Sequence, residues 1–434
     1  MRAMKDSGVE WIGEMPDGWE IAALKRLGTP ETGSTPSKDN SAYWNGDIAW
    51  VSSKDMKSDY LLDSDDHITQ VAVDECGLTL FAPGTLIFCV RSGILRHTFP
   101  VAVATLPITI NQDLRALGLI SNVNPAFMLY YMRGMNDTIV TLYQKIGATV
   151  ESIEMDWLLY FPVVLPPREE QNHIVEYLDA KCAEIDALIE AKEKTNALLK
   201  ERRQSIVYEA VTKGLNPTVP MKDSGVEWIG VIPEGWKMAA LKRLGTPATG
   251  STPTKDNTDY WDGDIPWVSS KDMKSDYLLG SEDHITQTAV DECGVTLFAS
   301  GTLIFCVRSG ILRHTFPVAV ATLPVTINQD LRALSLTGDV NPAFLLYYMR
   351  GMNDTIVTFY QKIGATVESI EMDWFLYFPV VLPPREEQDR IVESLDSRCA
   401  SLDQTVKQNE VTIRKLKEYR QSLIYEAVTG KMEV

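Results

Sequence analysis

Residues 84–107 read GTLIFCVRSGILRHTFPVAVATLP, and the same letters return unchanged at residues 301–324. The repeat extends outward on both sides, so that residues 4–212 align with residues 221–429 at a constant offset and without a gap. A solenoid unit repeats every 20 to 50 residues or so, and this period is far longer. The chain is therefore one whole module copied twice, and it should present two nearly identical surfaces.

The composition is typical of a soluble globular protein, with 45% hydrophobic and 23% charged residues over 434 positions. A chain of this length can form about two to four domains with real cores. No apolar run reaches the roughly 18 residues of a membrane helix, and the first residues carry no export signal. We therefore expect a cytoplasmic protein without membrane contact. The six cysteines lack metal-ligand spacing and are expected to be reduced thiols.

The charge is unevenly distributed along the chain. The formal net charge is −18, which is unusual for a protein that binds nucleic acid. Residues 85–149 are nevertheless locally basic, with Arg91, Arg96, Arg115 and Lys145 among them, and the second copy behaves alike. A local basic surface can engage phosphates even when the whole chain is acidic. The acidic total suggests that a partner supplies much of the positive surface.

Each copy divides into two parts of different character. Residues 15–165 mix short strand-like runs, such as 85–90 and 101–106, with Gly and Pro turns. Asn124 followed by Pro125 is typical of a helix start, with Asn at the N-cap and Pro at the first helical position. The first part is therefore predicted to be a compact mixed α/β domain.

The second part is predicted to be a helix from about Arg168 until Gly214. Apolar residues recur there at steps of three, four or seven, which favours a coiled coil, at Ile174, Leu178, Ile185, Ile189, Leu199 and Ile206. A long helix packed on its own domain is the alternative. At about 1.5 Å per residue the helix would be roughly 65 Å long, which is longer than a small domain is wide. The two helices therefore most simply pair with each other. We expect an antiparallel pair, because a parallel pair would crowd both domains at one end.

Sequence signatures of catalysis are missing. No GxxxxGK[ST] phosphate loop is present, so the chain is not expected to be a nucleotide motor. The stretch Asn124-Pro125-Ala126-Phe127 is similar to the Asn-Pro-Pro-Tyr/Phe motif of amino-methyltransferases, but it lacks the second proline and a preceding Gly-rich loop. The helix-cap interpretation is favoured. His97 has no nucleophile at a suggestive spacing, and we expect a chain that is not itself an enzyme and holds no metal or cofactor.

Five segments occur in a fixed order in both copies. In the first copy they are GSTPSKDNSAYWNGDIAWVSSKDM (33–56), GTLIFCVRSG (84–93), INQDLRAL (110–117), GATVESI (147–153) and VVLPPREEQ (163–171). This order resembles the specificity (S) subunit of type I restriction–modification enzymes over almost the full length. The family's two recognition domains usually differ, whereas here they are closely alike.

The resemblance implies a fold of class α+β. Two mixed α/β target-recognition domains would be separated by a pair of long helices that form an antiparallel coiled coil, with a pseudo-two-fold internal repeat. The expected boundaries are recognition domain 1 at 1–166, a central coiled-coil helix at 167–214, a linker at 215–220, recognition domain 2 at 221–383 and a distal coiled-coil helix at 384–430.

The resemblance also implies a function within a complex. Each recognition domain would read a few base pairs of double-stranded DNA, and the helical rod would fix the length of a non-specific spacer. Two methyltransferase (M) subunits would dock beside the rods and methylate adenine N6 with S-adenosylmethionine, which this chain itself would not hold. Motor-nuclease (R) subunits would then join.

The internal repeat suggests the form of the DNA target. Two alike readers on a pseudo-two-fold axis match a duplex whose strands are two-fold related, so the target should be an interrupted palindrome. Segments 84–103 and 144–153 are identical between the copies, which favours the same contacts in both. Differences such as Asn45/Asp262 could make the half-sites unequal, and we expect them to be peripheral.

The strongest candidate DNA contacts surround glycine turns. Arg91, Arg96 and His97 flank a turn after a strand, and arginine commonly binds guanine in a bidentate way; an internal ion pair is the alternative. Lys145 and Thr149 belong to a glycine-containing loop suited to phosphates or base edges, and an ordinary surface loop is the alternative.

A third group of candidates follows the aromatic Trp50. Ser53, Lys54 and Lys57 are predicted to contact phosphates, whereas Trp50 and the aromatic residues before it are more typical of a core than of base stacking. The second copy supplies the equivalent candidates Ser270, Lys271, Lys274, Arg308, Arg313, His314, Lys362 and Thr366.

Two other classes of protein compete with this reading of the sequence. An assembly protein whose acidic surface mimics DNA would compete with DNA for a protein partner. An unrecognised enzyme would transfer methyl groups from S-adenosylmethionine to DNA without partners. A salt-sensitive and sequence-selective preference for duplex DNA would instead support the DNA-reading function.

Overall fold

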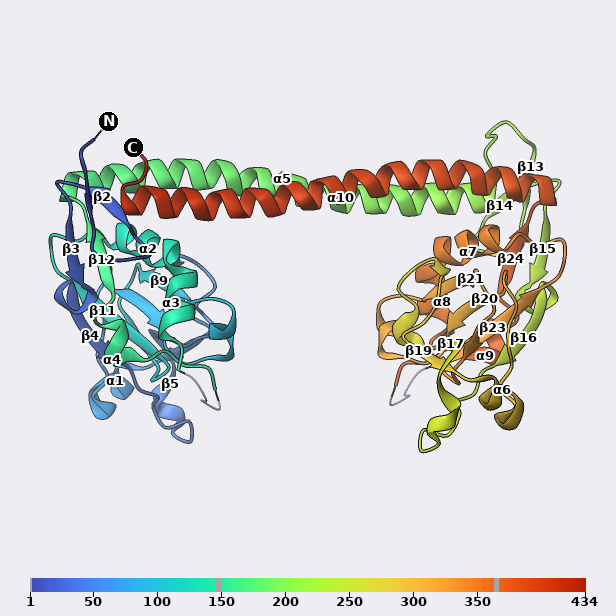
Figure 1. Cartoon of the computed structure of the whole chain (residues 1–434), viewed down its shortest axis with the longest axis horizontal. Coiled ribbons are helices and arrows are strands. Elements are labelled where there is room, and N and C mark those ends of the chain that lie inside the picture. Colours follow the sequence, from blue (N-terminus) through green and yellow to red (C-terminus); the bar gives the residue numbers. More distant parts are fainter. Residues whose placement is uncertain (1, 146–149, 363–366) are drawn as a thin grey trace. The chain divides into compact units, whose positions relative to one another are not determined.

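The computed structural model describes residues 2–145, 150–362 and 367–434. The chain forms two compact units, unit 1 of Met1–Glu193 with Glu410–Val434 and unit 2 of Lys194–Asn409. Two long helices, α5 (Arg168–Lys213) and α10 (Arg385–Thr429), each contribute to both units (Figure 1). The C-terminal end of each long helix therefore belongs to the unit built around the other copy.

The α/β domain of unit 1 precedes α5. Its elements are β1 (Met4–Asp6), β2 (Glu14–Pro16), β3 (Glu20–Ala23), β4 (Gly28–Thr32), β5 (Trp44–Val51), β6 (Tyr60–Leu61), β7 (Asp66–Ile68), α1 (Gln70–Cys76), β8 (Leu86–Cys89), β9 (Val101–Ala104), β10 (Ile108–Ile110), β11 (Leu114–Leu119), α2 (Pro125–Gly134), α3 (Asn136–Tyr143), α4 (Met155–Leu158) and β12 (Pro162–Leu165).

The α/β domain of unit 2 repeats this order between the two long helices. Its elements are β13 (Met221–Asp223), β14 (Val231–Pro233), β15 (Lys237–Ala240), β16 (Gly245–Thr249), β17 (Trp261–Val268), β18 (Tyr277–Leu278), β19 (Asp283–Ile285), α6 (Gln287–Cys293), β20 (Leu303–Cys306), β21 (Val318–Ala321), β22 (Thr326–Ile327), β23 (Leu331–Leu336), α7 (Pro342–Gly351), α8 (Asn353–Tyr360), α9 (Met372–Phe375) and β24 (Pro379–Leu382).

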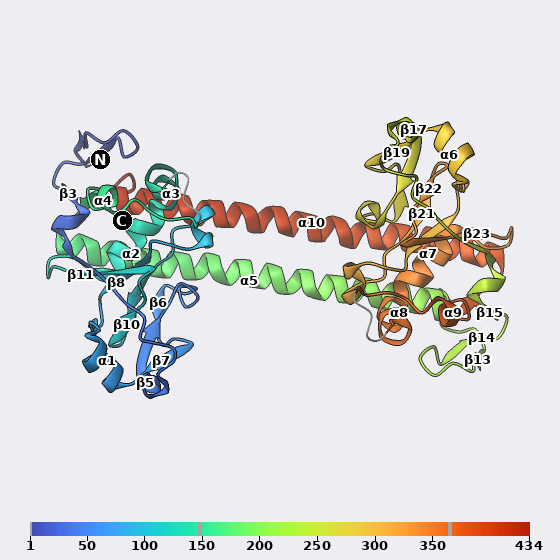
Figure 2. The same ribbon diagram turned by 90° about the horizontal axis from the view of Figure 1, so that it is seen from below.

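A five-stranded sheet in the order β4-β11-β8-β9-β6 lies at the centre of the first domain. Neighbouring strands are antiparallel except for β6, which runs parallel to β9. A three-stranded sheet of β10, β5 and β7 forms a smaller lobe with α1 (Figure 2). The second domain has the same strand order, β16-β23-β20-β21-β18, in its larger sheet.

Strand β8 is buried on both faces of the larger sheet. Leu86 and Phe88 belong to a core shared with α2 and the long helices, whereas Ile87 and Cys89 pack with β5 and β10 on the opposite face. A strand covered on both sides reads as a continuous apolar run, and LIFC is such a run. The two predicted strands at 85–90 and 101–106 thus form the middle of the sheet.

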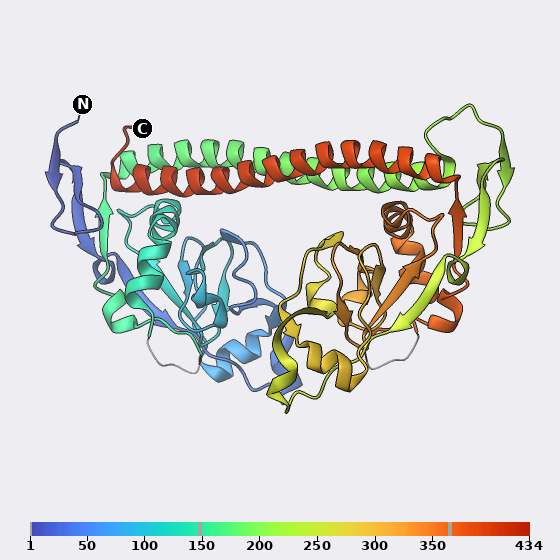
Figure 3. The same cartoon turned by 45° about the vertical axis from the view of Figure 1, so that its right-hand side comes forward.

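Helix α2 begins as its sequence predicts. The side chain of Asn124 accepts hydrogen bonds from the backbone amides of Ala126 and Phe127, and Pro125 occupies the first turn. This geometry confirms the helix-cap interpretation of this stretch over the methyltransferase-like motif. Phe127 and Tyr131 are fully buried between the sheet and the long helices, where α2 lies in Figure 3.

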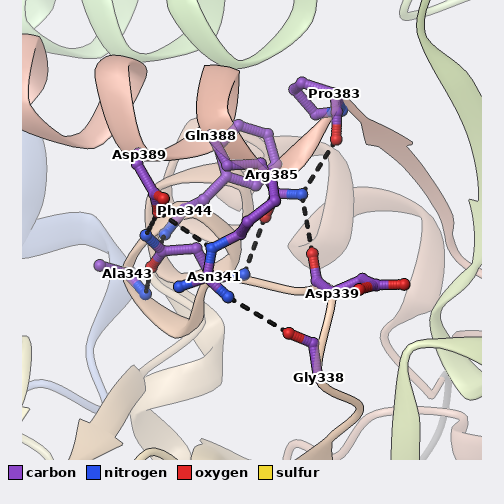
Figure 4. A network of polar contacts seen from close by, with 9 residues as sticks. All are labelled: Gly338, Asp339, Asn341, Ala343, Phe344, Pro383, Arg385, Gln388 and Asp389. Carbon is purple, nitrogen blue, oxygen red and sulfur yellow. Dashed lines mark hydrogen bonds and ion pairs between the residues drawn. The ribbon is translucent and has the colours of Figure 1, made fainter.

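A buried glutamine fastens each long helix to its α/β domain. In unit 2, Gln388 Nε2 donates to the carbonyls of Pro383 and Asp339 at 2.9 and 3.1 Å, and its Oε1 accepts from the Asn341 amide at 2.8 Å (Figure 4). Asn341 Nδ2 also donates to Asp389 Oδ1 at 2.6 Å. Gln171 makes the equivalent three bonds in unit 1, so the PPREEQ motif has a structural explanation in both copies.

Parts of α5 and α10 pair antiparallel inside each unit. In unit 1, Asp186 of α5 pairs with Arg420 of α10, and Glu193 of α5 pairs with Lys417 of α10. The residue number thus rises along α5 while it falls along α10, so the helices run in opposite directions. In unit 2, Asn196 bonds to Asn409 and Arg203 pairs with Asp403, which again gives opposite directions for the two helices. The predicted fold class, with two mixed α/β domains and an antiparallel pair of long helices, is confirmed.

Small residues let each long helix approach the α/β domain of the other copy. A Cβ atom on Gly351 of α7 would lie 3.4 Å from the Cα of Tyr208 in α5, so the two helices are already in close contact at this glycine. Gln204 Nε2 donates to the carbonyl of Arg350 at 3.0 Å beside this contact. Gln421 of α10 makes the same bond to Arg133 in unit 1, at 2.9 Å.

Candidate nucleic-acid interface

Two of the predicted DNA-contacting loops lie against each other in unit 1. The amide of Ser92 donates to the carbonyl of Glu151 at 3.0 Å, and the amide of Ile153 donates to the carbonyl of Val90 at 2.9 Å. Arg91 and Ser152 also form an isolated antiparallel bridge. The turn after β8 and the segment after α3 therefore share one surface, although they are about 60 residues apart in the sequence.

Lys145 lies at the start of this second loop. Its amide donates to the carbonyl of Ser152 at 2.8 Å, and its Nζ lies 3.7 Å from a carboxylate oxygen of Glu154. The side chain is 54% exposed, so this ion pair is weak and exchangeable. Thr149 and its counterpart Thr366 lie outside the described residues.

Arg96 is oriented by the carboxylate of Glu151. Its Nε donates to Glu151 Oε1 at 2.9 Å, and Nη2 contacts the same oxygen. A hydrogen bond from Glu151's own backbone amide, and then the Arg96 guanidinium, lower the pKa of this carboxyl group. Arg96 is 69% exposed, so the pair preorganises the guanidinium at the surface and contributes little to stability.

Arg91 has a looser internal partner. Its Nε lies 3.9 Å from Asp113 Oδ1, and the side chain is 61% exposed. The internal ion pair that the sequence left open is therefore present but long. His97 is exposed, and its backbone amide donates to the carbonyl of Ile94 at 3.0 Å at the end of the turn.

Sequence reasoning missed a polar pair close to Asp113, the ion-pair partner of Arg91. Thr35 Oγ1 of one loop donates to Gln112 Oε1 of another at 2.6 Å, and Gln112 directly precedes Asp113 in the chain. The two loops approach so closely that a Cβ atom on Gly33 would lie 1.8 Å from the Ile110 carbonyl. Both residues fall in segments quoted for the family resemblance, but their juxtaposition depends on tertiary structure and had no local signal.

The third group of candidates, Ser53, Lys54 and Lys57, does not belong to the paired loops of Arg91 and Lys145. Lys57 lines a cavity of about 490 Å³ together with Ile94, Arg133 and the long-helix residue Arg420, on the side of the turn that faces α10. Ser53 and Lys54 are in the turn between β5 and β6. No described contact joins these three residues to Arg91, so they do not extend its cluster.

The counterparts of this group in unit 2 are partly neutralised. Lys271 Nζ lies 3.4 Å from Glu282 and 2.9 Å from Asp283, and Lys274 lies 3.3 Å from Glu282. Ser270 begins a short turn with Lys271. These acidic neighbours weaken the prediction of phosphate contacts at this turn.

The aromatic residues of the small lobe are structural. Trp50 is 5% exposed, and its Nε1 donates to the carbonyl of Ser34 at 3.0 Å. Trp44 packs edge-on against Trp50 with ring centroids 5.2 Å apart. The core interpretation is therefore supported for these rings.

Unit 2 reproduces most of these loop contacts, although no ion pair of Arg308 matching that of Arg91 is described. Arg313 Nε donates to Glu368 Oε1 at 2.8 Å, and Lys362 Nζ lies 3.7 Å from Glu371. Arg308 bridges to Ser369, Thr252 bonds Gln329 at 2.6 Å, and His314 ends the turn as His97 does. The chain thus carries two copies of one cationic, exposed loop pair.

Searches for other kinds of site found little among the described residues. No group of three or more His, Cys, Asp or Glu side chains in residues 2–145, 150–362 and 367–434 could hold a metal ion. None of the helices in this part of the chain is long and apolar enough to cross a membrane.

Comparison with known proteins identifies relatives over nearly the whole chain. Residues 16–200 and 233–413 match the family model described as type I restriction modification DNA specificity domain. The type I restriction enzyme MjaIX specificity subunit of Methanocaldococcus jannaschii is 25% identical over 435 residues, which is 98% of this chain and 95% of that protein. The EcoR124I/EcoR124II specificity subunit of Escherichia coli is 33% identical over 162 residues, 37% of this chain and 40% of that protein.

Solved structures share the fold. One chain from a type I R-M system superposes with a TM-score of 0.75 at 17% identity and covers 96% of this chain and 99% of its own length. The HsdS subunit from Thermoanaerobacter tengcongensis superposes with a TM-score of 0.53 at 18% identity, over 96% of this chain and 98% of its own length.

Proposed function

The chain belongs to the type I restriction–modification DNA specificity family, and from that premise we propose that it reads a bipartite DNA target through two equivalent loop pairs. It acts as the sequence-recognition subunit of a type I restriction–modification complex. The observation that carries the proposal is the duplicated arrangement of exposed cations, Arg91 with Arg96 in unit 1 and Arg308 with Arg313 in unit 2.

The geometry of these loops suits contact with a duplex. Arg96 and Arg313 are held at the surface by single carboxylates, so each guanidinium is already extended when DNA arrives. An arginine can bind the O6 and N7 atoms of guanine, and lysine can bind a phosphate, as Lys145 would here. Because the two copies carry the same side chains in the same contacts, the two half-sites should be alike and inverted with respect to each other.

The chain's role in the complex is non-catalytic. Adenine N6 methylation with S-adenosylmethionine belongs to two methyltransferase subunits that dock on it, and motor-nuclease subunits join the same assembly. The acidic net charge of −18 favours a division of labour, in which partner subunits supply additional positive surface around the DNA. The named relatives are specificity subunits, which gives no support to a DNA-mimicking scaffold.

The experiment that tests the proposal is a methylome measurement. The chain is expressed with the methyltransferase subunit of its own system in a host that lacks both, and N6-methyladenine is mapped by sequencing. The expected result is one motif with two inverted half-sites and a fixed spacer. Methylation without the chain, or a single contiguous motif with it, would contradict the proposal.

A matched pair of variants separates reading from folding. The double variant Arg91→Ala and Arg308→Ala should lose methylation at the motif, while Arg202→Ala should retain it. Arg202 is an exposed cation of α5 whose equivalent in the second copy is Tyr419, so its charge is not part of the repeated surface.

A further inference from the structure

A buried pair of asparagines lies in the interface between the long helices. Asn196 of α5 and Asn409 of α10 are each 7% exposed, and Asn409 Nδ2 donates to Asn196 Oδ1 at 2.8 Å. Asn196 continues the core spacing of Ile185 and Ile189, seven residues beyond the latter. An amide therefore occupies a position at which the pattern of the helix calls for an apolar residue.

This pair breaks the internal repeat. The equivalent of Asn196 in the second copy is Ile413, and the equivalent of Asn409 in the first copy is Lys192. Three other core positions keep the same residue in both copies, Ile174/Ile391, Leu178/Leu395 and Cys182/Cys399, and others such as Ile206/Leu423 exchange one apolar residue for another. The middle of the helices is thus where α5 and α10 differ in the chemistry of their contact surfaces.

The ends of the helices cannot distinguish α5 from α10. Tyr208 of α5 donates to the carbonyl of Trp228 at 2.7 Å, and Tyr425 of α10 makes the same bond to Trp11 at 2.6 Å. The glutamine bonds described above are equally duplicated. In two copies of the chain, α5 could pair with α5, or α10 with α10, and every one of these end contacts would still form.

The asparagines discriminate against those pairings. If α10 paired with a second α10 in the native register, Asn409 would face Ile413, and its buried amide would lose the hydrogen bond that Asn196 now accepts. If α5 paired with a second α5, Asn196 would face Lys192. Only the pairing of α5 with α10 places one amide opposite the other, and a single buried Asn is known to specify partner and register in coiled coils.

We propose that the Asn196–Asn409 hydrogen bond selects pairing of α5 with α10 of the same chain over pairing of equivalent helices from two copies of this chain. The duplicated ends supply affinity, and the unrepeated amide pair supplies the choice of partner. The tether between the helices adds a local concentration that reinforces this choice. Pairing of α5 with α10 therefore keeps recognition domains 1 and 2 of one chain together, rather than two copies of the same recognition domain from different chains.

The test is the self-association of the full chain after complete unfolding and refolding. In the double variant Asn196→Ile and Asn409→Ile, the α10–α10 pairing no longer places an asparagine amide against the side chain of Ile413. Sedimentation velocity over a dilution series should show wild type as a monomer. The apparent dissociation constant for self-association should fall at least about tenfold in the variant, which corresponds to about 1.4 kcal/mol.

Controls make the outcome decisive. The variant Ile206→Leu with Val207→Ile makes α5 more like α10 at apolar core positions but keeps both amides, and it should stay monomeric. Thermal melting of the Asn→Ile variant should be no lower than that of wild type, because apolar side chains replace buried amides. A variant that is as monomeric as wild type, or a wild type that self-associates equally, overturns the inference. No DNA is present, so the result is independent of whether the chain reads DNA.

Discussion

Replacing Arg91 or Arg308 with alanine should weaken recognition of opposite half-sites by equal amounts. The fold should tolerate either change, because Arg91 is 61% exposed and its ion pair with Asp113 spans 3.9 Å. Exposed pairs of this kind contribute about 0–1 kcal/mol to stability. The circular-dichroism spectrum and melting temperature of both variants should therefore remain close to those of wild type.

The expected loss at the DNA is larger. A bidentate arginine–guanine contact is worth about 1–3 kcal/mol of discrimination, which is a factor of about 5 to 160 in affinity. The repeated contacts around both arginines predict the same factor for Arg91→Ala and Arg308→Ala. Each variant should lose discrimination at one base position while the other half-site is read normally.

The assay is competition binding to DNA at one fixed salt concentration, with the chain in complex with its methyltransferase subunit. Each competitor duplex has a substitution in one half-site, so the two variants should show complementary patterns. An effect from only one of the two arginines would refute the equivalence of the readers. Weakening that is uniform across all sequences, with a shallower dependence on salt, would show that these arginines contact phosphates rather than bases.

Three further changes test other parts of the structure. Gln388→Ala leaves three buried backbone groups without partners and should lower the free energy of unfolding by about 2–4 kcal/mol in a denaturant titration; a loss below about 0.5 kcal/mol would contradict the fastening role. Glu151→Gln removes the carboxylate beside an exposed arginine, so DNA affinity should rise and the logarithmic salt slope should steepen by about one, as measured by titration at several salt concentrations. Burial raises the pKa of the Cys89 and Cys306 thiols to about 11, so mass spectrometry after alkylation near pH 8 should find both unmodified while the exposed Cys76 reacts. Because these pKa values are raised in the fold, the stability linked to the two thiols is complete below their ordinary value of 9.0 and should decline as the pH rises toward 11.

Repetition made much of the architecture readable from the sequence. The constant offset between copies predicted two like domains, and the heptad spacing predicted both long helices and their pairing. The cap at Asn124 was readable because capping depends on the residues immediately following it. These features are local or periodic, so a linear pattern contains them.

The features that the sequence concealed depend on contacts between distant segments. The juxtaposition of Thr35 with Gln112 requires the sheet to bring two loops together. A pattern of apolar residues could not reveal Asn196, because its polar side chain is buried through a hydrogen bond with Asn409 of the other helix. The burial of Gln171 likewise follows from three bonds to two separate segments, whereas its motif showed only a family signature.

The exchange of helix ends between the copies has a consequence for synthesis on the ribosome. Unit 1 includes residues 410–434, which are translated only after the whole of unit 2, although the rest of unit 1 is translated before it. At about 5–20 residues per second, the apolar surface around Gly134 waits roughly 15 to 60 s for Ile424 and Val428 to cover it. A chain that stopped before Ile424 would keep that surface open, and it would be a target for chaperones and proteases.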